Sequence, residues 1–270
     1  MNTNSNTYTV IYSIGLVVVV AAVLAFVAKF LQPMQDENVK KDTISQILTA
    51  ADVEFTEANV LEAYDGAIKE AILVDLEGKV VGNLDLKTRE VYGTSDLKKH
   101  MIDQDLFPVY VFENVIVIPC YGAGLWGPIW GYVGVDKNDY TTITKACFGH
   151  KGETPGLGAK ITDEPAAFAD KFPGKVVGPF EVAKNVDAAN PGAVNAISGA
   201  TITSQAVGKA LNQWFGFYQA YFNANMKPST ECTECTECTE CTECTECTEC
   251  TEQASAEDAA EETAEVEQNN

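Results

Sequence analysis

Residues 194–204 read V-N-A-I-S-G-A-T-I-T-S and open the last apolar helix that the sequence predicts. Apolar residues recur there every four positions, as one helix face requires: Ile202, Ala206, Ala210 and Trp214, with Leu211 beside them. Ser198 precedes the run and is predicted to be the N-cap. A helix start carries unpaired N–H groups and the positive end of the dipole, so this one is a natural seat for a phosphate.

The residues at this helix start leave room for a ligand. Gly199 and Ala200 add no bulk, and Thr201 adds a hydroxyl that can be esterified. The stretch therefore predicts one of two structures. It is either an ordinary capped helix whose first turn is rich in Ser and Thr, or a phosphate site with Thr201 at its centre.

Two glycine-rich segments precede this helix. They read G-A-G-L-W-G-P-I-W-G at residues 122–131 and H-K-G-E-T-P-G-L-G at residues 150–158. Glycine lets a backbone approach a ligand closely, although such segments are also typical of simple turns. The G-x-G lacks the third spaced glycine and the following helix of a dinucleotide-binding motif, and no G-x-x-x-x-G-K-[ST] supports nucleotide hydrolysis.

Taken together, these segments resemble a known family. S-G-A-T-I-T-S is similar to the flavinylation motif of bacterial FMN-binding domains, and G-x-G-L-W and E-T-P-G-L-G recur in the same family. The resemblance extends over residues 10–225 and is strongest to the C subunits of sodium-translocating NADH:quinone oxidoreductases. The family usually has Asp three residues before the Ser of the motif, where this chain has Asn195.

The resemblance implies roles for particular residues. Thr201 would hold FMN covalently through a phosphoester, with Ser198, Gly199 and Ala200 around the phosphate. The isoalloxazine ring or ribityl chain would be lined by residues of the two glycine-rich segments: Leu125, Trp126, Glu153, Thr154, Gly156, Leu157 and Gly158. Leu157 and Trp126 are suited to pack on the flat ring, although ordinary core packing remains the alternative for Trp126 and Trp130.

The N-terminal region predicts a membrane anchor. After a short polar segment at residues 1–9, residues 11–28 are uncharged and mostly apolar, and the segment extends over residues 10–31 if Lys29 snorkels. A cleaved signal peptide would have a basic start and a shorter apolar core, so we expect an uncleaved transmembrane helix.

The orientation of this anchor follows from two conflicting signals. Lys29, Lys40 and Lys41 come after the helix and no Lys or Arg precedes it, which would keep the domain in the cytoplasm by the positive-inside rule. The resemblance implies the opposite side of the bacterial inner membrane, the periplasm. Because three lysines are a small bias, we expect the periplasmic placement.

Residues 32–41 are predicted to be a polar linker and residues 42–226 an α+β domain that binds FMN. Helical patterns cover residues 42–51, 60–70 and 164–172. Two hairpins are predicted, one from residues 72–74 and 80–81 and one from residues 109–112 and 115–118. Residues 132–135 and 141–148 are further strand candidates.

The C-terminal residues 227–270 differ in composition from the rest. From Ser229 onward they hold 13 Glu, one Asp and no Lys or Arg. The whole chain has a net charge of −21, so its composition does not suggest nucleic-acid binding, which needs a basic patch. Thr-Glu-Cys repeats place seven of the nine cysteines in overlapping C-x-x-C pairs. This predicts a disordered tail, which is either an incidental repeat expansion or a segment that binds soft metals.

The resemblance implies an electron-transfer subunit that passes electrons from NADH, bound on another subunit, through FMN towards quinone, coupled to Na⁺ export. Partners would be those other subunits, membrane lipid and a flavin transferase. Two alternatives are the FMN subunit of an Rnf-type complex and, in another class, a membrane-anchored metal-binding protein that uses its tail. His100 and His150 have no metal-protease spacing, so no metal site is predicted in the domain.

Overall fold

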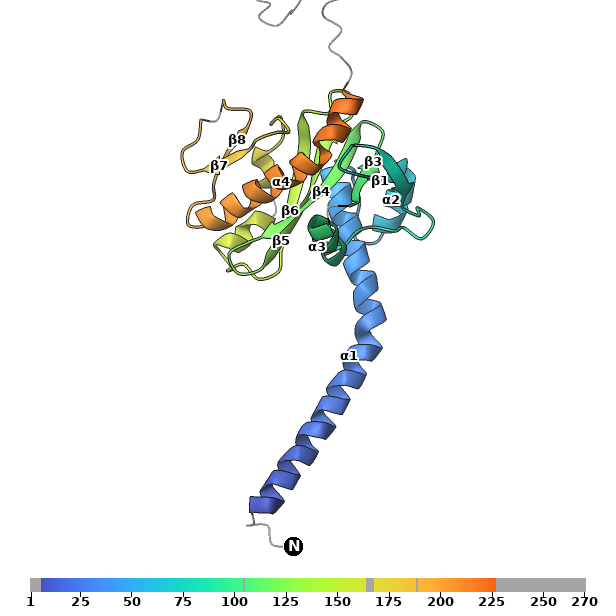
Figure 1. Cartoon of the computed structure of the whole chain (residues 1–270), viewed down its shortest axis with the longest axis vertical. Coiled ribbons are helices and arrows are strands. Elements are labelled where there is room, and N and C mark those ends of the chain that lie inside the picture. Colours follow the sequence, from blue (N-terminus) through green and yellow to red (C-terminus); the bar gives the residue numbers. More distant parts are fainter. Residues whose placement is uncertain (1–5, 104, 164–167, 188, 227–270) are drawn as a thin grey trace, which may run out of the picture. The chain divides into compact units, whose positions relative to one another are not determined.

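A computed structural model describes residues 6–103, 105–163, 168–187 and 189–226, which form four α-helices, eight strands and two 3-10 helices (Figure 1). Their mixture of antiparallel sheet and helices confirms the predicted α+β class. The tail predicted at residues 227–270 and the first five residues of the predicted N-terminal segment lie outside the described residues.

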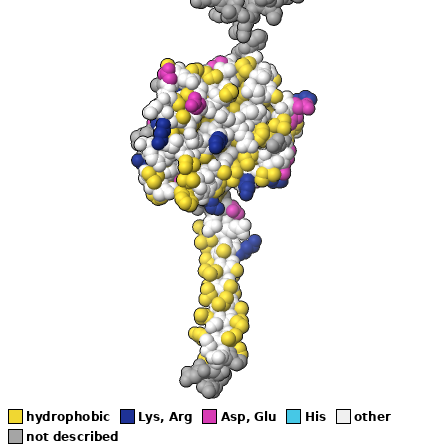
Figure 2. Space-filling view, turned by 60° about the vertical axis from the view of Figure 1, so that its left-hand side comes forward, with side chains coloured by type: hydrophobic (Ala, Val, Ile, Leu, Met, Phe, Trp, Pro, Cys, Tyr) yellow, Lys and Arg dark blue, Asp and Glu magenta, His cyan; other side chains and the backbone are white. Residues whose placement is uncertain are grey.

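Helix α1 (Asn6–Ala50) contains the predicted membrane segment at residues 10–31. Among the described residues it is the one helix long and apolar enough to cross a membrane, and its apolar window is wholly exposed. Apolar side chains cover this part of the helix in the space-filling view (Figure 2). About 20 residues at a rise of about 1.5 Å span the roughly 30 Å hydrocarbon core of a bilayer.

The prediction of a linker at residues 32–41 is wrong, because these residues are helical and continue α1 without a break. Pro33 costs the helix one backbone donor but does not end it. Further along the helix, Lys41 and Glu37 form an ion pair of 3.3 Å, and Lys40 Nζ donates to the Thr88 carbonyl of the domain. Helical pairing and contact with the domain therefore replace an extended linker.

The domain is built on one antiparallel sheet with strand order β2-β1-β3-β4-β5-β6. Its strands are β1 (Glu70–Val74), β2 (Val80–Asn83), β3 (Phe107–Val111), β4 (Val115–Ala123), β5 (Pro128–Asp136) and β6 (Ile143–His150). The two predicted hairpins are confirmed as β1–β2 and β3–β4. The helix predicted at residues 60–70 ends earlier, because Glu70 already pairs with Val111 of β3.

The other elements are shorter, apart from the last helix. They are α2 (Val60–Ala67), α3 (Thr94–Asp103), η1 (Gly158–Thr162), η2 (Ala169–Lys171), β7 (Glu181–Ala183), β8 (Ala193–Asn195) and α4 (Thr201–Asn225). Of the helix predicted at residues 164–172, the first four residues lie outside the described part, and the remainder forms only η2. Phe172 N–H donates to the Ala169 carbonyl, the 3-10 pattern, and Pro173 removes the next donor.

Helices cover both faces of the sheet (Figure 1). Successive residues of a strand point to opposite faces, so Val109 and Tyr110 belong to different cores. On one face α4 buries Trp214 and α3 buries Leu97. On the other face the end of α1 buries Ile47 together with α2. The sheet is thus fixed from both sides, and the start of α4 lies at a defined place above it.

A glycine in β5 allows the end of α1 to approach the sheet. A Cβ atom at Gly134 would lie 2.1 Å from the Ala50 carbonyl oxygen and 2.7 Å from Thr144 Oγ1. We expect Gly134→Ala to lower the free energy of unfolding by about 3 kcal/mol, because backbone must move. Gly216→Ala, on α4 with nothing within 4 Å of its added Cβ, should be neutral or stabilising. Denaturant unfolding measures both free energies, and equal values for the two variants would contradict this prediction.

Candidate functional site

The start of α4 differs from the predicted cap. Ala200 is the N-cap, and Ser198, which we predicted for that position, lies two residues earlier, so that prediction is wrong. The turn is closed instead by Ser204, whose Oγ donates to the Ala200 carbonyl at 2.9 Å and accepts from the N–H of Ile197 at 3.0 Å. Gly199 supports this turn with a φ of +81°.

The predicted buried face of α4 is confirmed only in part. Ala210, Leu211 and Trp214 are buried, but Ala206 is half-buried and Ile202 is exposed. The reason is geometric, since a step of four residues turns about 40° more than a full helical turn. The row therefore drifts off the sheet, and it leaves Ile202 at the surface beside Thr201.

A buried carboxylate joins the three motif segments. Glu153 is 4% exposed, and its Oε1 accepts from the N–H of Trp126 at 3.0 Å. Its Oε2 accepts from Thr203 Oγ1 at 2.7 Å. The loop after β6, the turn between β4 and β5 and the first turn of α4 are thereby held together, although they are far apart in the sequence.

Two glycines make room for this carboxylate. A Cβ at Gly124 would lie 2.5 Å from Glu153 Oε1, and a Cβ at Gly158 would lie 2.4 Å from Glu153 Oε2. A side chain at either position would displace the Glu153 carboxylate from its hydrogen bonds, so both positions favour glycine. The glycine-rich character of the two segments therefore serves a specific contact as well as a turn.

A pocket of about 290 Å³ opens beside this contact. Its lining residues come from all three segments and one further loop: Leu125, Trp126, Glu153, Thr154, Leu157, Gly158, Lys184, Gly199, Ala200, Thr201, Ile202 and Thr203. Two predicted site residues, Ser198 and Gly156, are not among them. Three lining residues were not predicted from the sequence: Lys184, Ile202 and Thr203. The two last belong to the quoted motif, whereas no sequence signal marks Lys184.

The three hydroxyls of the T-I-T-S motif have different surroundings. Thr203 is 2% exposed and donates to Glu153, and Ser204 is fully buried and donates to Ala200. Thr201 is half-buried and lines the pocket, and no hydrogen-bond partner of its hydroxyl is found among the described residues. Thr201 is therefore the hydroxyl of this motif that a ligand in the pocket can reach.

Exposed apolar side chains surround the pocket. Trp126 is 69% exposed, Ile202 60%, Leu125 48% and Leu157 46%. Single exposed apolar residues are ordinary on a protein surface, but several around one hollow indicate a binding surface. Core packing is thereby excluded for Trp126, whereas Trp130 is half-buried and donates from Nε1 to Gln46 Oε1 at 2.9 Å.

The pocket suits a flavin phosphate in its chemistry. A free hydroxyl, a helix start and one lysine stand near each other, and an apolar rim offers a surface for a flat ring. Its volume is close to the lower limit of common ligand pockets, about 300 Å³, so a larger ligand would stay partly accessible.

The remaining candidates stay outside the pocket. His150 Nδ1 accepts from the N–H of Glu153 at 3.3 Å, so His150 supports the loop. Cys120 is buried, and Cys147 is half-buried and donates from Sγ to the Gln46 carbonyl at 3.2 Å. In the described part of the chain, no group of three or more His, Cys, Asp or Glu side chains could hold a metal ion.

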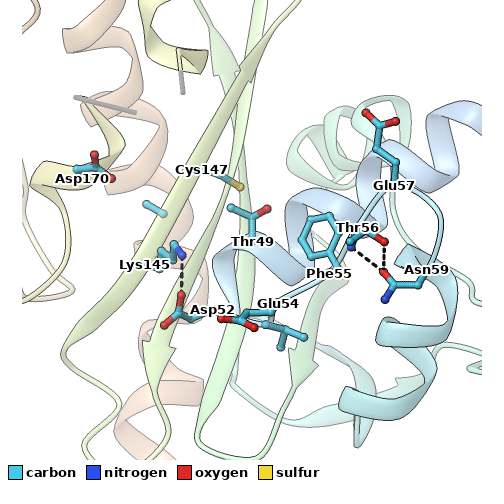
Figure 3. A pocket seen from close by; sticks show the side chains of 12 residues that line it. Thr49, Asp52, Glu54, Phe55, Thr56, Glu57, Asn59, Lys145, Cys147 and Asp170 are labelled. Carbon is cyan, nitrogen blue, oxygen red and sulfur yellow. Dashed lines mark hydrogen bonds and ion pairs between the residues drawn. The ribbon is translucent and has the colours of Figure 1, made fainter. Parts of the chain in front are cut away.

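A larger hollow of about 1230 Å³ lies elsewhere, between β6 and the residues that follow α1 (Figure 3). Asp52 and Lys145 form an ion pair of 2.6 Å in it, and Asn59 accepts from Thr56. Cys147 lines it as well. None of the residues predicted from the motifs takes part, and the acidic side chains there are exposed to solvent.

Comparison with known proteins gives the family of this site. The family described as FMN-binding domain matches residues 124–216, which include every residue that lines the pocket. The C subunit of the Na(+)-translocating NADH-quinone reductase of Haemophilus ducreyi is 29% identical over 233 residues, which cover 78% of this chain and 90% of that protein. The corresponding protein of Chlamydia trachomatis is 36% identical over 140 residues, 43% of each chain.

Solved structures agree with these relatives. The C subunit of the same reductase from Parabacteroides distasonis is 32% identical, with a TM-score of 0.62 over 71% of this chain and 96% of that chain. NqrC from Shewanella oneidensis is 25% identical, with a TM-score of 0.59 over 70% of this chain and 98% of that chain. The resemblance stated from the motifs is thereby confirmed, as are FMN as the cofactor and an electron-transfer role. The chain belongs to the family of the C subunits of the Na(+)-translocating NADH-quinone reductases, membrane-anchored, FMN-binding members of an oxidoreductase complex.

Proposed function

We propose that Thr201 carries FMN covalently, through a phosphoester between its Oγ1 and the flavin phosphate. The observation that supports this most directly is the contrast among the three hydroxyls of the motif. Thr203 and Ser204 are buried and already donate to protein oxygens, whereas Thr201 lines the pocket. An attaching enzyme, a flavin transferase, can reach Thr201 without unfolding the helix.

The start of α4 would hold the phosphate. The first N–H groups of a helix have no intrahelical acceptor and carry the positive end of its dipole, which favours an anion. Gly199 and Ala200 leave space for the phosphate oxygens there. The ester would therefore lie where its negative charge is stabilised by backbone, with Glu153 kept away from it by its own hydrogen bonds.

The apolar rim would hold the isoalloxazine ring. Leu125, Trp126, Leu157 and Ile202 present apolar surface around the phosphate seat, and covering that surface with a flat ring removes it from water. Bound FMN supplies one- and two-electron redox chemistry, while the protein sets its position and surroundings. Because the pocket is small, part of the ring would remain accessible to an electron donor or acceptor.

The role of the whole protein follows from this placement. We propose that electrons from NADH, which reacts at another subunit, pass through this flavin towards quinone, and that the complex couples this flow to Na⁺ export. The single membrane helix is consistent with a need for partner subunits, because its apolar surface is uncovered within the described residues. Lipid and the helices of those subunits would cover it.

We also propose that the FMN domain faces the periplasm. The positive-inside rule acts weakly on long segments, so the lysines after the helix need not retain a whole domain. Two of them are also engaged in the fold, Lys41 with Glu37 and Lys40 with Thr88. A reporter enzyme that works only in the periplasm should be active when fused to the C-terminus, and one that works only in the cytoplasm should be inactive. The reverse pattern would refute this orientation.

The function is tested best in the complete complex in native membranes. With Thr201→Ala in this chain, we expect NADH-dependent quinone reduction and Na⁺ transport to be lost, while NADH oxidation by an artificial acceptor, at the site where NADH binds, persists. The control is Ser198→Ala, a hydroxyl outside the pocket, which should preserve all three activities. Undiminished quinone reduction by the Thr201→Ala complex would show that electrons bypass this site.

A further inference from the structure

We propose that Lys184 binds the phosphate of the flavin and makes the pocket prefer phosphorylated over unphosphorylated flavins. The inference rests on the proposed FMN site at Thr201. It assigns a residue that neither the motifs nor the family match singles out, since Lys184 lies well before the S-G-A-T-I-T-S segment.

The charges at the pocket point to Lys184. Of the residues that line it, Lys184 carries the one positive charge and Glu153 the one negative charge. Glu153 is nearly inaccessible, and both of its oxygens accept hydrogen bonds from the protein. Lys184 is exposed, and within the described residues no acidic partner of its ammonium group is found. An anion in the pocket therefore meets one uncommitted cation and a carboxylate that is already engaged.

The backbone around Lys184 is fixed to the start of α4. Strands β7 and β8 run parallel, with Ala183 opposite Asn195, and Ala196 N–H donates to the Ala183 carbonyl at 2.9 Å. The C-terminal ends of the two strands therefore lie side by side. Strand β7 leads directly to Lys184, and β8 leads towards Thr201. Strand β7 also lies directly on α4, because a Cβ at Gly208 would be only 2.7 Å from Val182 Cγ2.

The turn after Lys184 is held by Asn195, at the position where the resembling family usually has Asp. Asn195 Oδ1 accepts from the N–H of Val186 at 3.0 Å, and its Nδ2 donates to the Val186 carbonyl at 3.4 Å. Asn185 takes a φ of +57° within this turn. An amide satisfies both backbone groups of Val186, whereas a carboxylate could only accept. Asn195 thus positions the loop that brings Lys184 to the pocket.

The expected size of the effect is modest. Lys184 is exposed, so its attraction to a phosphate is weakened by water and by salt. We expect it to contribute about fivefold to the affinity for a phosphorylated flavin at low ionic strength. The helix start contributes a separate preference for the anion, which should persist without the lysine.

The test compares FMN with riboflavin, which lacks only the phosphate. Full-length Thr201→Ala chain in detergent, which has no hydroxyl to esterify, is titrated with each flavin. The ratio of the two dissociation constants is then measured in three further backgrounds: Lys184→Gln, Lys184→Arg and Lys209→Gln. Lys209 is a matched control, because it is exposed on α4 and does not line the pocket.

We expect Lys184→Gln to reduce the preference for FMN by about fivefold, and high salt to reduce it similarly in the parent chain. Lys184→Arg and Lys209→Gln should retain it. The inference is overturned if Lys184→Gln leaves the ratio unchanged, if Lys209→Gln lowers it equally, or if neither flavin binds. Flavin that the unmodified chain retains after denaturation is measured in a separate experiment. That experiment tests the FMN site at Thr201 itself, so its failure is distinguishable from the absence of an effect of Lys184.

Discussion

Thr201→Ala should remove all flavin that survives denaturation of the chain. An ester bond persists when the protein unfolds, so the unmodified chain, co-produced with a flavin transferase, should fluoresce in a denaturing gel. The variant should not, while its thermal unfolding should change little, because the Thr201 side chain is half-buried and makes no hydrogen bond within the described residues. We expect in-gel fluorescence to fall to background, since Thr203 and Ser204 are buried and engaged and Ser198 lies outside the pocket.

Two matched variants sharpen this result. Ser198→Ala removes a hydroxyl of the same motif that does not line the pocket, and it should retain full fluorescence. Thr201→Ser keeps a hydroxyl at the proposed position and should retain part of it. Fluorescence of Thr201→Ala equal to that of the unmodified chain would mean that another residue holds the flavin.

Glu153→Ala should have the largest effect on the assembly of the site. It leaves the Trp126 N–H and the buried Thr203 hydroxyl without their acceptor, and a buried unpaired group costs about 1–3 kcal/mol. We therefore expect a loss of about 1–3 kcal/mol in the free energy of unfolding, with poor flavin attachment as a consequence. Denaturant unfolding and in-gel fluorescence measure the two effects.

Glu153→Gln is the discriminating control for this prediction. The glutamine oxygen can still accept from Trp126, and Thr203 can turn its hydroxyl to accept from the amide. Stability and flavin attachment should therefore stay close to those of the unmodified chain. If Glu153→Gln were as damaging as Glu153→Ala, the negative charge itself would be required, and the carboxylate would have a role beyond joining the three segments.

Much of the domain was predictable from the sequence because its signals are local. Short apolar runs on either side of a turn indicated the β1–β2 and β3–β4 hairpins, and an uncharged apolar run indicated the membrane segment within α1. The lining of the pocket by Trp126, Glu153 and Thr201 followed from motifs that a family shares, and it was not derivable from spacing alone.

The errors arose where tertiary contacts decide the local structure. Residues 32–41 are polar enough to be read as a linker, yet pairing within the helix and contact with Thr88 keep them helical. Ser198 has the chemistry of an N-cap, but Ser204 closes the turn from inside the helix. Lys184 reaches the pocket only because two short strands pair, β7 and β8, which no pattern in the sequence reveals.

The proposed covalent bond between FMN and Thr201 is tested most directly by peptide mass spectrometry. Trypsin cleaves after Lys184 and Lys209, so residues 185–209 form one peptide that contains every hydroxyl of the motif. In chain co-produced with a flavin transferase, this peptide should be heavier by one FMN less one water, with fragment ions that place the added mass on Thr201. An unmodified peptide, or added mass on Thr203 or Ser204, would contradict the account.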